Sequence, residues 1–398
     1  MGAMSSGAKE TARPLRVLVA GGGTGGHVYP GLAVAEAVQA AAPRAEIRFA
    51  GTRRGLEAIL VPQAGYRLHT VPASGFRGLG PLARLRFLLN FAAGLVSSLW
   101  LLARWRPDVV LGTGGYASAP IMAAARLRSI PCALQEQNTI PGSANRLLAR
   151  WADRIYLGFA ESQQYFPEKS CLFTGNPVRA SFSRGQKPST AEKEVSPCLS
   201  ANANDDGLRL LIFGGSRGAR TLNNAAKGAT ALWQRQPCPA IWLQTGPAQK
   251  EELVAAYAEF PQDRVRVTAY IFDMPTALAW ADLAVCRAGA MTLAELHVLG
   301  KPAVLVPFPH ATDDHQLKNA RACEEAGAAV VVTNDALTPQ VLVDTVESLA
   351  EDSARLQAMG QAAAALARPE AATKIAQDLL RLTLGEDAVL PGEYKDVP

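Results

Sequence analysis

Two glycine-rich turns in this sequence have the residue types and spacing of phosphate-binding loops. The apolar residues 17–20 lead into Gly21-Gly22-Gly23-Thr24-Gly25-Gly26-His27, and the apolar residues 210–213 lead into Gly214-Gly215-Ser216-Arg217-Gly218. An Ala- and Leu-rich stretch follows each turn. A glycine turn between a strand and a helix exposes backbone N–H groups at the helix N-terminus, where the helix dipole favours an anion. We therefore expect two similar domains that face a cleft, with a phosphorylated ligand between them.

The first turn also satisfies the dinucleotide-binding pattern G-x-G-x-x-G. That pattern requires an acidic residue at the end of the next strand, where the acid binds ribose. The corresponding strands end in Phe49-Ala50-Gly51-Thr52 and Leu243-Gln244-Thr245, without an acid. The absence of this acid at both strand ends counts against a nicotinamide cofactor. A Walker loop is also disfavoured, because Lys and Ser/Thr are missing after Gly26. The alternative is a tight turn that only packs a helix on a strand.

His27 lies at the expected start of the helix after the first turn. A helix N-terminus lowers the pKa of a histidine, and a neutral imidazole can act as a general base. The sequence leaves open a histidine that only caps or packs this helix. We favour the catalytic role.

Residues 287–295 form another strand-to-helix turn of small residues, which lets the backbone approach a ligand. Glu295, expected on the first turn of the helix, could bind ribose hydroxyls. It could equally complement the helix dipole. Further on, Asp313-Asp314-His315-Gln316 contains residue types that bind metals, but neighbouring side chains on a helix point about 100° apart and form a poor cluster. We expect a helix start that hydrogen-bonds a sugar there, and no metal site.

Apolar stretches that predict strands alternate with helical stretches, which is typical of parallel sheets covered by helices on both faces. In such α/β sheets, ligands bind at the carboxyl ends of the strands. Polar or glycine-rich residues follow several strands, as in Gly114-Gly115-Tyr116 and Glu136-Gln137-Asn138. Residues 338–384 should be entirely helical. The expected strands are Arg16–Ala20, Ile47–Ala50, Arg67–Val71, Asp108–Leu111, Pro131–Leu134, Asp153–Leu157, Leu208–Phe213, Ala240–Gln244, Val265–Tyr270, Leu283–Cys286, Ala303–Val306 and Ala329–Thr333.

The composition indicates a globular chain of two domains. Of 398 residues, 48% are hydrophobic and 19% charged, which is not the composition of a disordered chain. The six cysteines form no C-x-x-C pair, so neither a disulfide framework nor a zinc site is expected, which fits a reducing cytosol. Residues 1–14 lack the apolar run of a signal peptide. The net charge of +5 is too small to imply nucleic-acid binding.

A basic and apolar segment predicts contact with an anionic membrane surface. Residues 58–107 contain no acid but six arginines. Within them, residues 87–103 are uncharged but short for a membrane span and interrupted by polar residues, so we reject a transmembrane helix. We expect residues 76–91 to dock on the membrane and the second half of 89–105 to be an ordinary core helix. The membrane-facing residues would be Phe76, Arg77, Leu79, Leu82, Arg84, Arg86 and Phe87.

Six short stretches in this order resemble the MurG family of peptidoglycan glycosyltransferases, over roughly Arg16 to Leu384. The resemblance implies the GT-B fold, in which two Rossmann-like domains face a nucleotide-sugar cleft. The domains would be residues 15–182, facing the acceptor and the membrane, and residues 207–368, binding the UDP-sugar. Residues 183–206 would be a linker or a surface loop, and a helix at about 370–384 would pack back on the first domain. The stretches are 22–31, 114–116, 136–138, 175–179, 214–219 and 286–292.

The resemblance also implies an activity and its residues. An inverting transferase would move N-acetylglucosamine from UDP-GlcNAc to the muramyl 4-hydroxyl of lipid I, giving lipid II and UDP, with no cofactor or metal. His27 would be the base, and Thr24, Gly25, Gly26, Tyr116 and Asn138 would line the cleft. Arg179 and Ser216 would contact the nucleotide, Ile271 and Phe272 the uracil, and Gln316 the sugar. The turn that binds diphosphate and ribose would be Ala290, Met291, Thr292, Leu293, Ala294 and Glu295.

The family resemblance further implies a peripheral protein on the cytoplasmic face of the cell membrane. Its partners would be UDP-GlcNAc, lipid I and the anionic membrane surface, with cell-wall and division machinery as candidate protein partners and no nucleic acid. Gln135 and His315 depart from the residues that members often carry there. Three alternatives stay open: another GT-B enzyme such as a diacylglycerol glucosyltransferase, a UDP-GlcNAc 2-epimerase, and a nucleotide-sugar sensor without chemistry.

Overall fold

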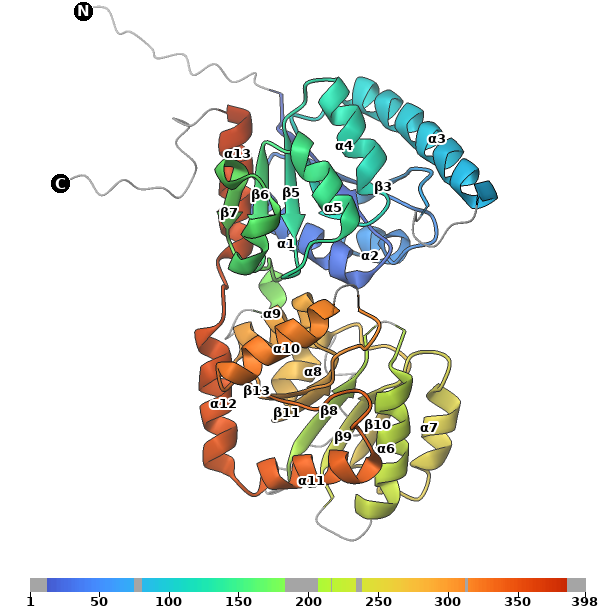
Figure 1. Cartoon of the computed structure of the whole chain (residues 1–398), viewed down its shortest axis with the longest axis vertical. Coiled ribbons are helices and arrows are strands. Elements are labelled where there is room, and N and C mark those ends of the chain that lie inside the picture. Colours follow the sequence, from blue (N-terminus) through green and yellow to red (C-terminus); the bar gives the residue numbers. More distant parts are fainter. Residues whose placement is uncertain are drawn as a thin grey trace, which may run out of the picture.

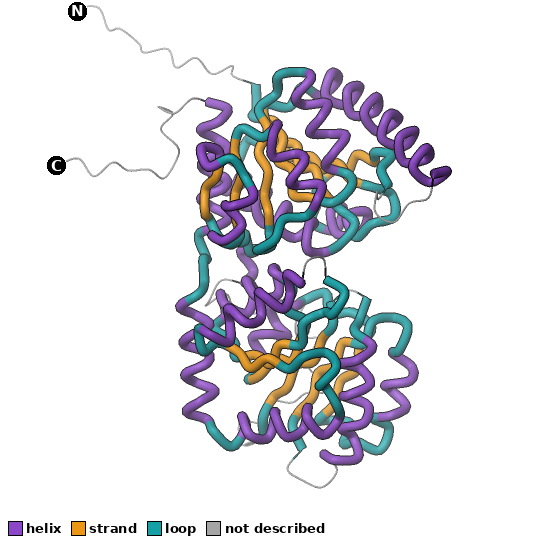
Figure 2. Tube along the Cα trace, viewed as in Figure 1, coloured by secondary structure: helices purple, strands orange, loops and turns teal. Residues whose placement is uncertain are grey.

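The computed structural model contains two parallel sheets, one in each half of the chain, stacked along the long axis of the molecule (Figure 1). Helices lie on both sides of each set of strands (Figure 2). The predicted fold class of two parallel-sheet α/β domains is confirmed. The residue limits given above for the domains remain a prediction. The structure describes residues 13–74, 81–182, 207–215, 217–233, 238–311 and 314–384.

Several predicted site residues lie outside the described residues. These are Phe76, Arg77, Leu79 and Ser216, and the same holds for the side chains of Leu82 and Arg84.

The first sheet has seven strands in the order β3-β2-β1-β4-β5-β6-β7. From β1 the chain adds β2 and β3 toward one edge of the sheet. It then returns to the middle and adds β4 to β7 toward the other edge, so the topological switch point lies between β1 and β4. A ligand crevice is expected outside the carboxyl ends of these two strands. The strands are β1 (Arg16–Gly21), β2 (Glu46–Gly51), β3 (Arg67–Thr70), β4 (Val109–Gly114), β5 (Cys132–Glu136), β6 (Arg154–Leu157) and β7 (Cys171–Phe173).

Helices on both faces bury this first sheet. One face packs against α1, and the other packs against α3 and α4. The helices are α1 (Gly25–Ala41), α2 (Glu57–Gln63), α3 (Pro81–Trp105), α4 (Ser118–Leu127) and α5 (Ser143–Leu148). Short 3-10 helices follow at η1 (Ala149–Trp151), η2 (Ala160–Tyr165), η3 (Glu168–Ser170) and η4 (Ala180–Phe182).

The second sheet has six strands in the order β10-β9-β8-β11-β12-β13, and its switch point lies between β8 and β11. The strands are β8 (Arg209–Phe213), β9 (Ala240–Gln244), β10 (Val265–Thr268), β11 (Leu283–Cys286), β12 (Ala303–Leu305) and β13 (Ala329–Val331). The helices are α6 (Arg220–Trp233), α7 (Lys250–Ala256), α8 (Met274–Trp280), α9 (Ala290–Leu299), α10 (His315–Glu325), α11 (Pro339–Ala350), α12 (Ser353–Ala365) and α13 (Ala371–Leu384).

The last helix returns to the first sheet. In Figure 1, α11 and α12 lie beside the second sheet, whereas α13 (red) lies beside the first. Ile375, Ala376 and Leu379 of α13 belong to the same buried cluster as Val34 and Val38 of α1. Asp378 accepts a hydrogen bond from the buried Tyr156 hydroxyl, at 2.8 Å. The end of the chain therefore completes the core of the first domain.

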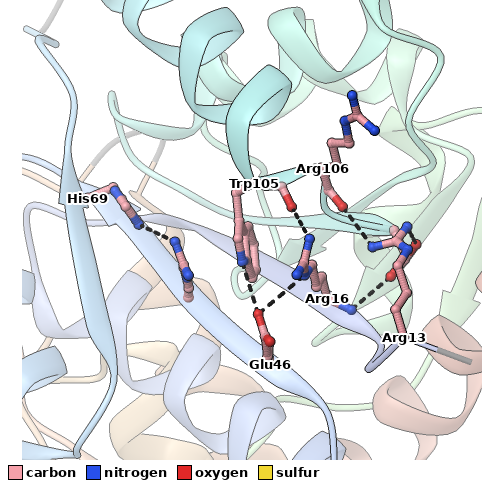
Figure 3. A network of polar contacts seen from close by, with 8 residues as sticks. Arg13, Arg16, Glu46, His69, Trp105 and Arg106 are labelled. Atoms are coloured by element: carbon pink, nitrogen blue, oxygen red, sulfur yellow. Dashed lines mark hydrogen bonds and ion pairs between the residues drawn. The ribbon is translucent and has the colours of Figure 1, made fainter. Parts of the chain in front are cut away.

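A polar cluster fastens the end of α3 to the amino ends of β1 and β2 (Figure 3). Glu46 Oε2 accepts hydrogen bonds from Arg16 Nε and Trp105 Nε1, each at 3.2 Å. Arg16 NH1 also donates to the Trp105 carbonyl at 2.8 Å. This cluster lies at the end of the sheet opposite to the glycine turns, so its acid is structural.

Two elements differ from the sequence expectation. Strand β7 was not predicted, because it is a three-residue edge strand that follows irregular 3-10 turns. Helix α1 begins at Gly25, two residues before its expected start at His27, and contains Pro30. A proline inside a helix lacks one N–H bond to the carbonyl four residues earlier, here the one of Gly26, close to the helix start.

Candidate functional site

The first glycine turn runs between β1 and α1. One of its N–H groups binds a side chain of the protein, and two others remain open at the start of α1. Gly22 and Gly23 have φ angles of 156° and 93°. The Gly23 N–H donates to Glu57 Oε2 at 2.7 Å. No side chain caps α1 at Thr24, so the N–H groups of Gly25 and Gly26 have no partner among the described residues. An open helix N-terminus of this kind suits an anion.

His27 lies on the first turn of α1, enclosed by backbone. A Cβ atom built on Gly114 would come within 2.8 Å of the His27 ring, and only a glycine therefore fits beside it. His27 Nδ1 is 3.3 Å from Thr24 Oγ1. Burial lowers the pKa of His27, while a backbone hydrogen bond with Gly22 and the charge of Glu57 oppose this shift. The imidazole is therefore neutral near pH 7 and can accept a proton.

The residues after β4 and β5 form the neighbouring wall. Gly114 and Gly115 have φ angles of 97° and 78°, and Tyr116 after them is 54% exposed. The buried Glu136 accepts hydrogen bonds from the Asn138 N–H at 2.9 Å and from Asn145 Nδ2 at 2.8 Å. Burial raises the pKa of Glu136 above its usual value, and these donors offset only part of that shift. Glu136 thus holds the wall in place, and the half-buried Asn138 also donates from its side-chain Nδ2 to Glu136 Oε1 at 3.2 Å.

The second glycine turn is packed against the end of β9. The Gly218 N–H donates to the Gly215 carbonyl at 2.8 Å. A Cβ on Gly218 would lie 1.9 Å from the Thr245 carbonyl oxygen, so this position, with φ of 75°, requires glycine. Gln244 Nε2 also donates to the Gly215 carbonyl, at 2.9 Å.

Helix α9 presents a second open N-terminus, just after the switch-point strand β11. Gly289 caps it without a side-chain hydrogen bond, and the N–H groups of Ala290, Met291 and Thr292 have no partner within the described chain. The Leu293 N–H differs, because it donates to the Gly289 carbonyl at 3.0 Å. Three N–H donors are therefore open to a ligand here.

Glu295 is a nearly buried carboxylate on α9. It was expected on the first turn, but α9 begins at Ala290 and so Glu295 belongs to the second turn. That position is too far along for the dipole role that the sequence left open. The side chain is 9% exposed and accepts no hydrogen bond from the described residues, and burial raises its pKa to about 7. The opposing influence on this pKa comes from Arg179.

Aromatic and cationic groups join the two walls of the cleft. The Tyr29 hydroxyl of α1 lies 2.8 Å from the Tyr270 hydroxyl after β10. The Arg179 guanidinium lies 4.7 Å from the centroid of the Tyr29 ring, and its buried Nε has no partner. The Tyr270 ring packs edge-on against Phe272, with centroids 4.8 Å apart. Residues from both domains thus converge on the space beside Glu295.

The remaining predicted donor residues lie on the second wall. The Ile271 side chain is buried, but its backbone N–H and C=O have no partner among the described residues, and Phe272 is 65% exposed. Gln316 Oε1 accepts a hydrogen bond from the Phe308 N–H at 3.0 Å. The side chains of Leu293 and Ala294 face an interdomain cavity of about 190 Å³ instead.

Helix α3 exposes an apolar face. Its inner side chains, Leu101, Leu102 and Trp105, are buried, as expected for a core helix. The expectation fails for the outer side of the second half, because Val96 and Trp100 are each 66% exposed. The exposed apolar face consists of Leu85, Leu88, Leu89, Val96 and Trp100. By length and composition alone, Leu85–Trp105 could also cross a membrane, although part of it packs against the sheet.

In the part of the chain that the structure describes, no three His, Cys, Asp or Glu side chains gather closely enough to hold a metal ion.

Comparison with known proteins identifies the family. Residues 17–157 match the glycosyltransferase family 28 N-terminal domain, and residues 209–377 match the C-terminal domain of the same family. The chain is 44% identical over 376 residues to a Geobacter sulfurreducens protein, covering 94% of this chain and all of that protein. That relative is a UDP-N-acetylglucosamine--N-acetylmuramyl-(pentapeptide) pyrophosphoryl-undecaprenol N-acetylglucosamine transferase.

A solved structure supports the same family assignment. The crystal structure of Acinetobacter baumannii MurG superposes with a TM-score of 0.69 at 30% identity, over 92% of this chain and all of that one. The chain belongs to the MurG family. A UDP-GlcNAc 2-epimerase from Neisseria meningitidis superposes with a TM-score of 0.67 over 92% of this chain and all of the other. At 14% identity, that likeness is one of fold alone.

Three residues around the site of this MurG-family chain were not predicted from the sequence. Glu57 was not predicted because it lies on α2, six residues after the end of β2, where the dinucleotide pattern would place its acid. Tyr29 and Tyr270 were overlooked because their contact joins residues 241 positions apart. One feature of the sequence could have pointed to Glu57: the two glycines shortly before it, Gly51 and Gly55, which leave room for its side chain.

Proposed function

We propose that this chain transfers N-acetylglucosamine from UDP-GlcNAc to the muramyl 4-hydroxyl of lipid I, producing lipid II and UDP with inversion at the anomeric carbon. The name of the Geobacter sulfurreducens relative describes this transfer. The observation that carries the proposal is the pair of uncapped helix N-termini on α1 and α9, with the unpartnered Glu295 between the two domains. Such a site suits two diphosphate groups and a ribose.

The donor would bind on the second domain. The open N–H groups of Ala290, Met291 and Thr292 would hold the diphosphate, and the Glu295 carboxylate would accept hydrogen bonds from the ribose hydroxyls. The unpaired Ile271 backbone groups would read the edge of the uracil. The other proposed donor contacts are Phe272 beside the base, Arg179 and Ser216 at the nucleotide, and Gln316 at the sugar, with Leu293 and Ala294 contributing to the turn.

The acceptor would bind on the first domain. The N–H groups of Gly25 and Gly26 would receive the pyrophosphate of lipid I, with Thr24, Asn138 and Tyr116 lining the same side. Neutral His27 would take the proton of the 4-hydroxyl as the oxygen attacks the anomeric carbon from the face opposite to UDP. The bond to UDP breaks in the same step, and its negative charge would be stabilised by the α9 N–H groups and Arg179. This arrangement supplies the charge stabilisation that a metal gives elsewhere.

A lipid-borne acceptor requires docking on a membrane. We propose that the exposed apolar face of α3 lies on the cytoplasmic surface of an anionic membrane, together with basic residues near its start. Arg86 and Phe87 are the described members of the predicted membrane-facing set. An amphipathic helix of this kind inserts its apolar side chains while basic side chains meet lipid phosphates.

The decisive experiment uses radiolabelled UDP-GlcNAc with and without a lipid I analogue. We expect labelled lipid and released UDP only when the acceptor is present. Epimerisation without an acceptor would instead identify an epimerase. UDP-GlcNAc binding without any UDP release would identify a sensor, and label on diacylglycerol rather than on the lipid I analogue would identify another lipid glycosyltransferase.

A further inference from the structure

The carboxylate of Glu57 is buried directly behind the first glycine turn. It is 1% exposed and accepts three hydrogen bonds, each at 2.7 Å. Gly23 N–H donates to one oxygen, and the N–H and hydroxyl of Thr52 donate to the other. The three donors to this carboxyl group are two backbone N–H groups and one hydroxyl, and no cationic side chain of the described residues hydrogen-bonds to it. The acid is thus held inside the domain by neutral donors.

The backbone around Glu57 is shaped to admit this side chain. A Cβ atom on Gly22 would lie 2.3 Å from the Glu57 carboxyl carbon, and one on Gly55 would lie 2.0 Å from Glu57 Oε2. A Cβ on Gly51 would lie 2.6 Å from Glu57 Cγ. Three positions on two segments, the glycine turn and the β2–α2 connection, therefore lack side chains where they touch Glu57. A buried acid that served only the packing of α2 would not require a glycine in the ligand turn.

The hydrogen bond to Gly23 decides which donors of the turn remain open. Because the Gly23 N–H points inward to Glu57, the N–H groups of Gly25 and Gly26 are left at the uncapped end of α1. Gly22 and Gly23 of the turn have positive φ angles, and glycine residues can adopt many other backbone conformations as well. Glu57 supplies the constraint that selects one of them.

The same carboxylate acts on His27. The elements around the imidazole are the turn itself, α1, the Gly114–Gly115 segment and α2. Of the charged side chains on these described elements, Glu57 alone influences the pKa of His27, and it raises that pKa against the effect of burial. A fixed negative charge favours the imidazolium that forms when His27 takes a proton.

We propose that Glu57 is a positioning residue of the transfer reaction, holding the turn that receives the acceptor and placing a negative charge behind the base. This inference rests on the proposed function, since it assigns the turn to the acceptor. Glu57 itself touches neither substrate in this assignment. Its effect reaches the reaction through Gly23 and His27.

The test is the variant Glu57→Gln, which keeps the shape of the side chain. Its amide must turn an N–H₂ group toward either Gly23 or Thr52, so one hydrogen bond is lost and the charge is removed. We expect kcat/KM for the lipid I analogue to fall about 10- to 100-fold, because small displacements of reacting groups are costly. The KM for UDP-GlcNAc should change less than about twofold. The acid limb of the pH profile should move to lower pH, since His27 loses the charge that raises its pKa.

The matched control is Glu46→Gln. Glu46 is also a hydrogen-bonded acid of the first sheet, but it lies with Arg16 and Trp105 at the opposite end (Figure 3). This control should leave the kinetics and the pH profile unchanged. A folded Glu57→Gln protein that behaves like the Glu46→Gln control would overturn the positioning role.

Two further measurements keep the inference separable from folding and from the function. Hydrogen exchange should show faster exchange of the Gly23 amide in Glu57→Gln and not in Glu46→Gln, whatever the activity. If Glu57→Gln does not fold, Thr52→Val removes one donor and keeps the charge; it should raise the KM for the acceptor about threefold with an unmoved acid limb. Unchanged kinetics in Thr52→Val would then refute the inference. Wild-type UDP release that ignores the acceptor would instead refute the proposed function.

Discussion

Three carboxylates are buried at the cleft, and their hydrogen bonding separates them. Glu57 and Glu136 each accept several hydrogen bonds from the protein. Glu295 accepts no hydrogen bond from the described residues, although its side chain is nearly buried, with 9% exposed. A buried carboxylate without donors is costly unless a ligand supplies them. This contrast supports the proposed role of Glu295 as the carboxylate that binds the ribose hydroxyls.

Replacing Glu295 with glutamine should weaken donor binding. The pKa of about 7 implies that Glu295 becomes protonated as the pH falls below 7, and a protonated carboxyl accepts ribose hydroxyls less well. For wild type, the KM for UDP-GlcNAc should therefore rise as the pH drops from 8 to 6. For Glu295→Gln, the KM should be about tenfold higher at pH 8 and nearly independent of pH. A wild-type KM that is flat across this range would contradict the ribose role.

The same variant should be more stable than wild type in the absence of ligand. The pKa of Glu295 is raised in the folded state, so the unfolded chain loses this proton at a lower pH and stability falls as the pH rises through the range from about 4.5 to 7. A shift of that size corresponds to about 3 kcal/mol. Thermal unfolding should show equal stability of the two proteins near pH 4.5 and a higher Tm for Glu295→Gln at pH 8. Equal Tm values at pH 8 would show that the ionised carboxylate is not destabilising.

Removing the proposed base should affect turnover. His27→Ala should lower kcat by about 10²–10⁴-fold, because general base catalysis contributes that much. In wild type, the low pKa of His27 keeps the imidazole neutral at pH 7, and activity should decline only when the pH falls below 6.5. Steady-state kinetics with both substrates check this. An intact kcat with a raised KM would assign His27 to binding instead.

Among the elements, α3 is the helix whose two faces do different work. Its inner face carries Leu101, Leu102 and Trp105 into the core, and Glu46 and Arg16 fasten its end. Its outer face exposes large apolar side chains, with a shallow hollow beside Trp100. Because the inner face anchors the helix, the outer face can insert into a membrane surface without the helix leaving the protein.

Substitutions on the outer face should therefore reduce membrane binding without unfolding the protein. Leu89→Ala combined with Trp100→Ala should weaken binding to phosphatidylglycerol vesicles at least tenfold, since each side chain loses about 1.5–3 kcal/mol of burial. Charge reversal of Arg77, Arg84 and Arg86 should weaken it further and reduce its salt dependence. Cosedimentation measures both. Val254→Ala, at a 48% exposed apolar position on α7, is the control. Unchanged vesicle binding in the α3 variants would exclude this docking face.

The elements also show how far sequence reasoning reaches. Each of the twelve expected strands exists, because buried parallel strands are short apolar runs bounded by glycine or polar residues. Strand β7 escaped because an edge strand of three residues has no periodic signal. Helix α1 starts two residues before the expected position of His27, because Gly25 and Gly26 of the glycine turn already belong to the helix.

Within the site, the strand-to-helix turns were predictable and the contacts between them were not. The glycine turns and the Ala290–Glu295 turn follow directly from local sequence. The Glu57 bond to Gly23 and the Tyr29 bond to Tyr270 depend on how separate elements pack. The two glycine turns predicted a cleft between two domains, but local pattern carries no information about such distant partners within it.

At the scale of the whole molecule, the chain crosses between the domains more than once. Side-chain hydrogen bonds link them at Tyr29 with Tyr270 and at Thr139 with Asn319. The last helix, α13, leaves the second domain and completes the first, where Tyr156 donates to Asp378. Among the described residues these polar links are few, so we expect each domain to unfold locally on its own and the stability of the first domain to depend on the last helix.

A pair of matched core substitutions tests this dependence. Leu379 of α13 is 1% exposed in the core of the first domain, and Leu349 of α11 is 1% exposed in the core of the second. Leu379→Ala should destabilise the first domain by about 2–5 kcal/mol, and Leu349→Ala should do the same to the second. Hydrogen exchange should then become faster in β1 and β4 for Leu379→Ala, and in β8 and β9 for Leu349→Ala. If either variant accelerated exchange equally in both sheets, the two domains would form one cooperative unit, and closure of the cleft by independent domain movement would have to be abandoned.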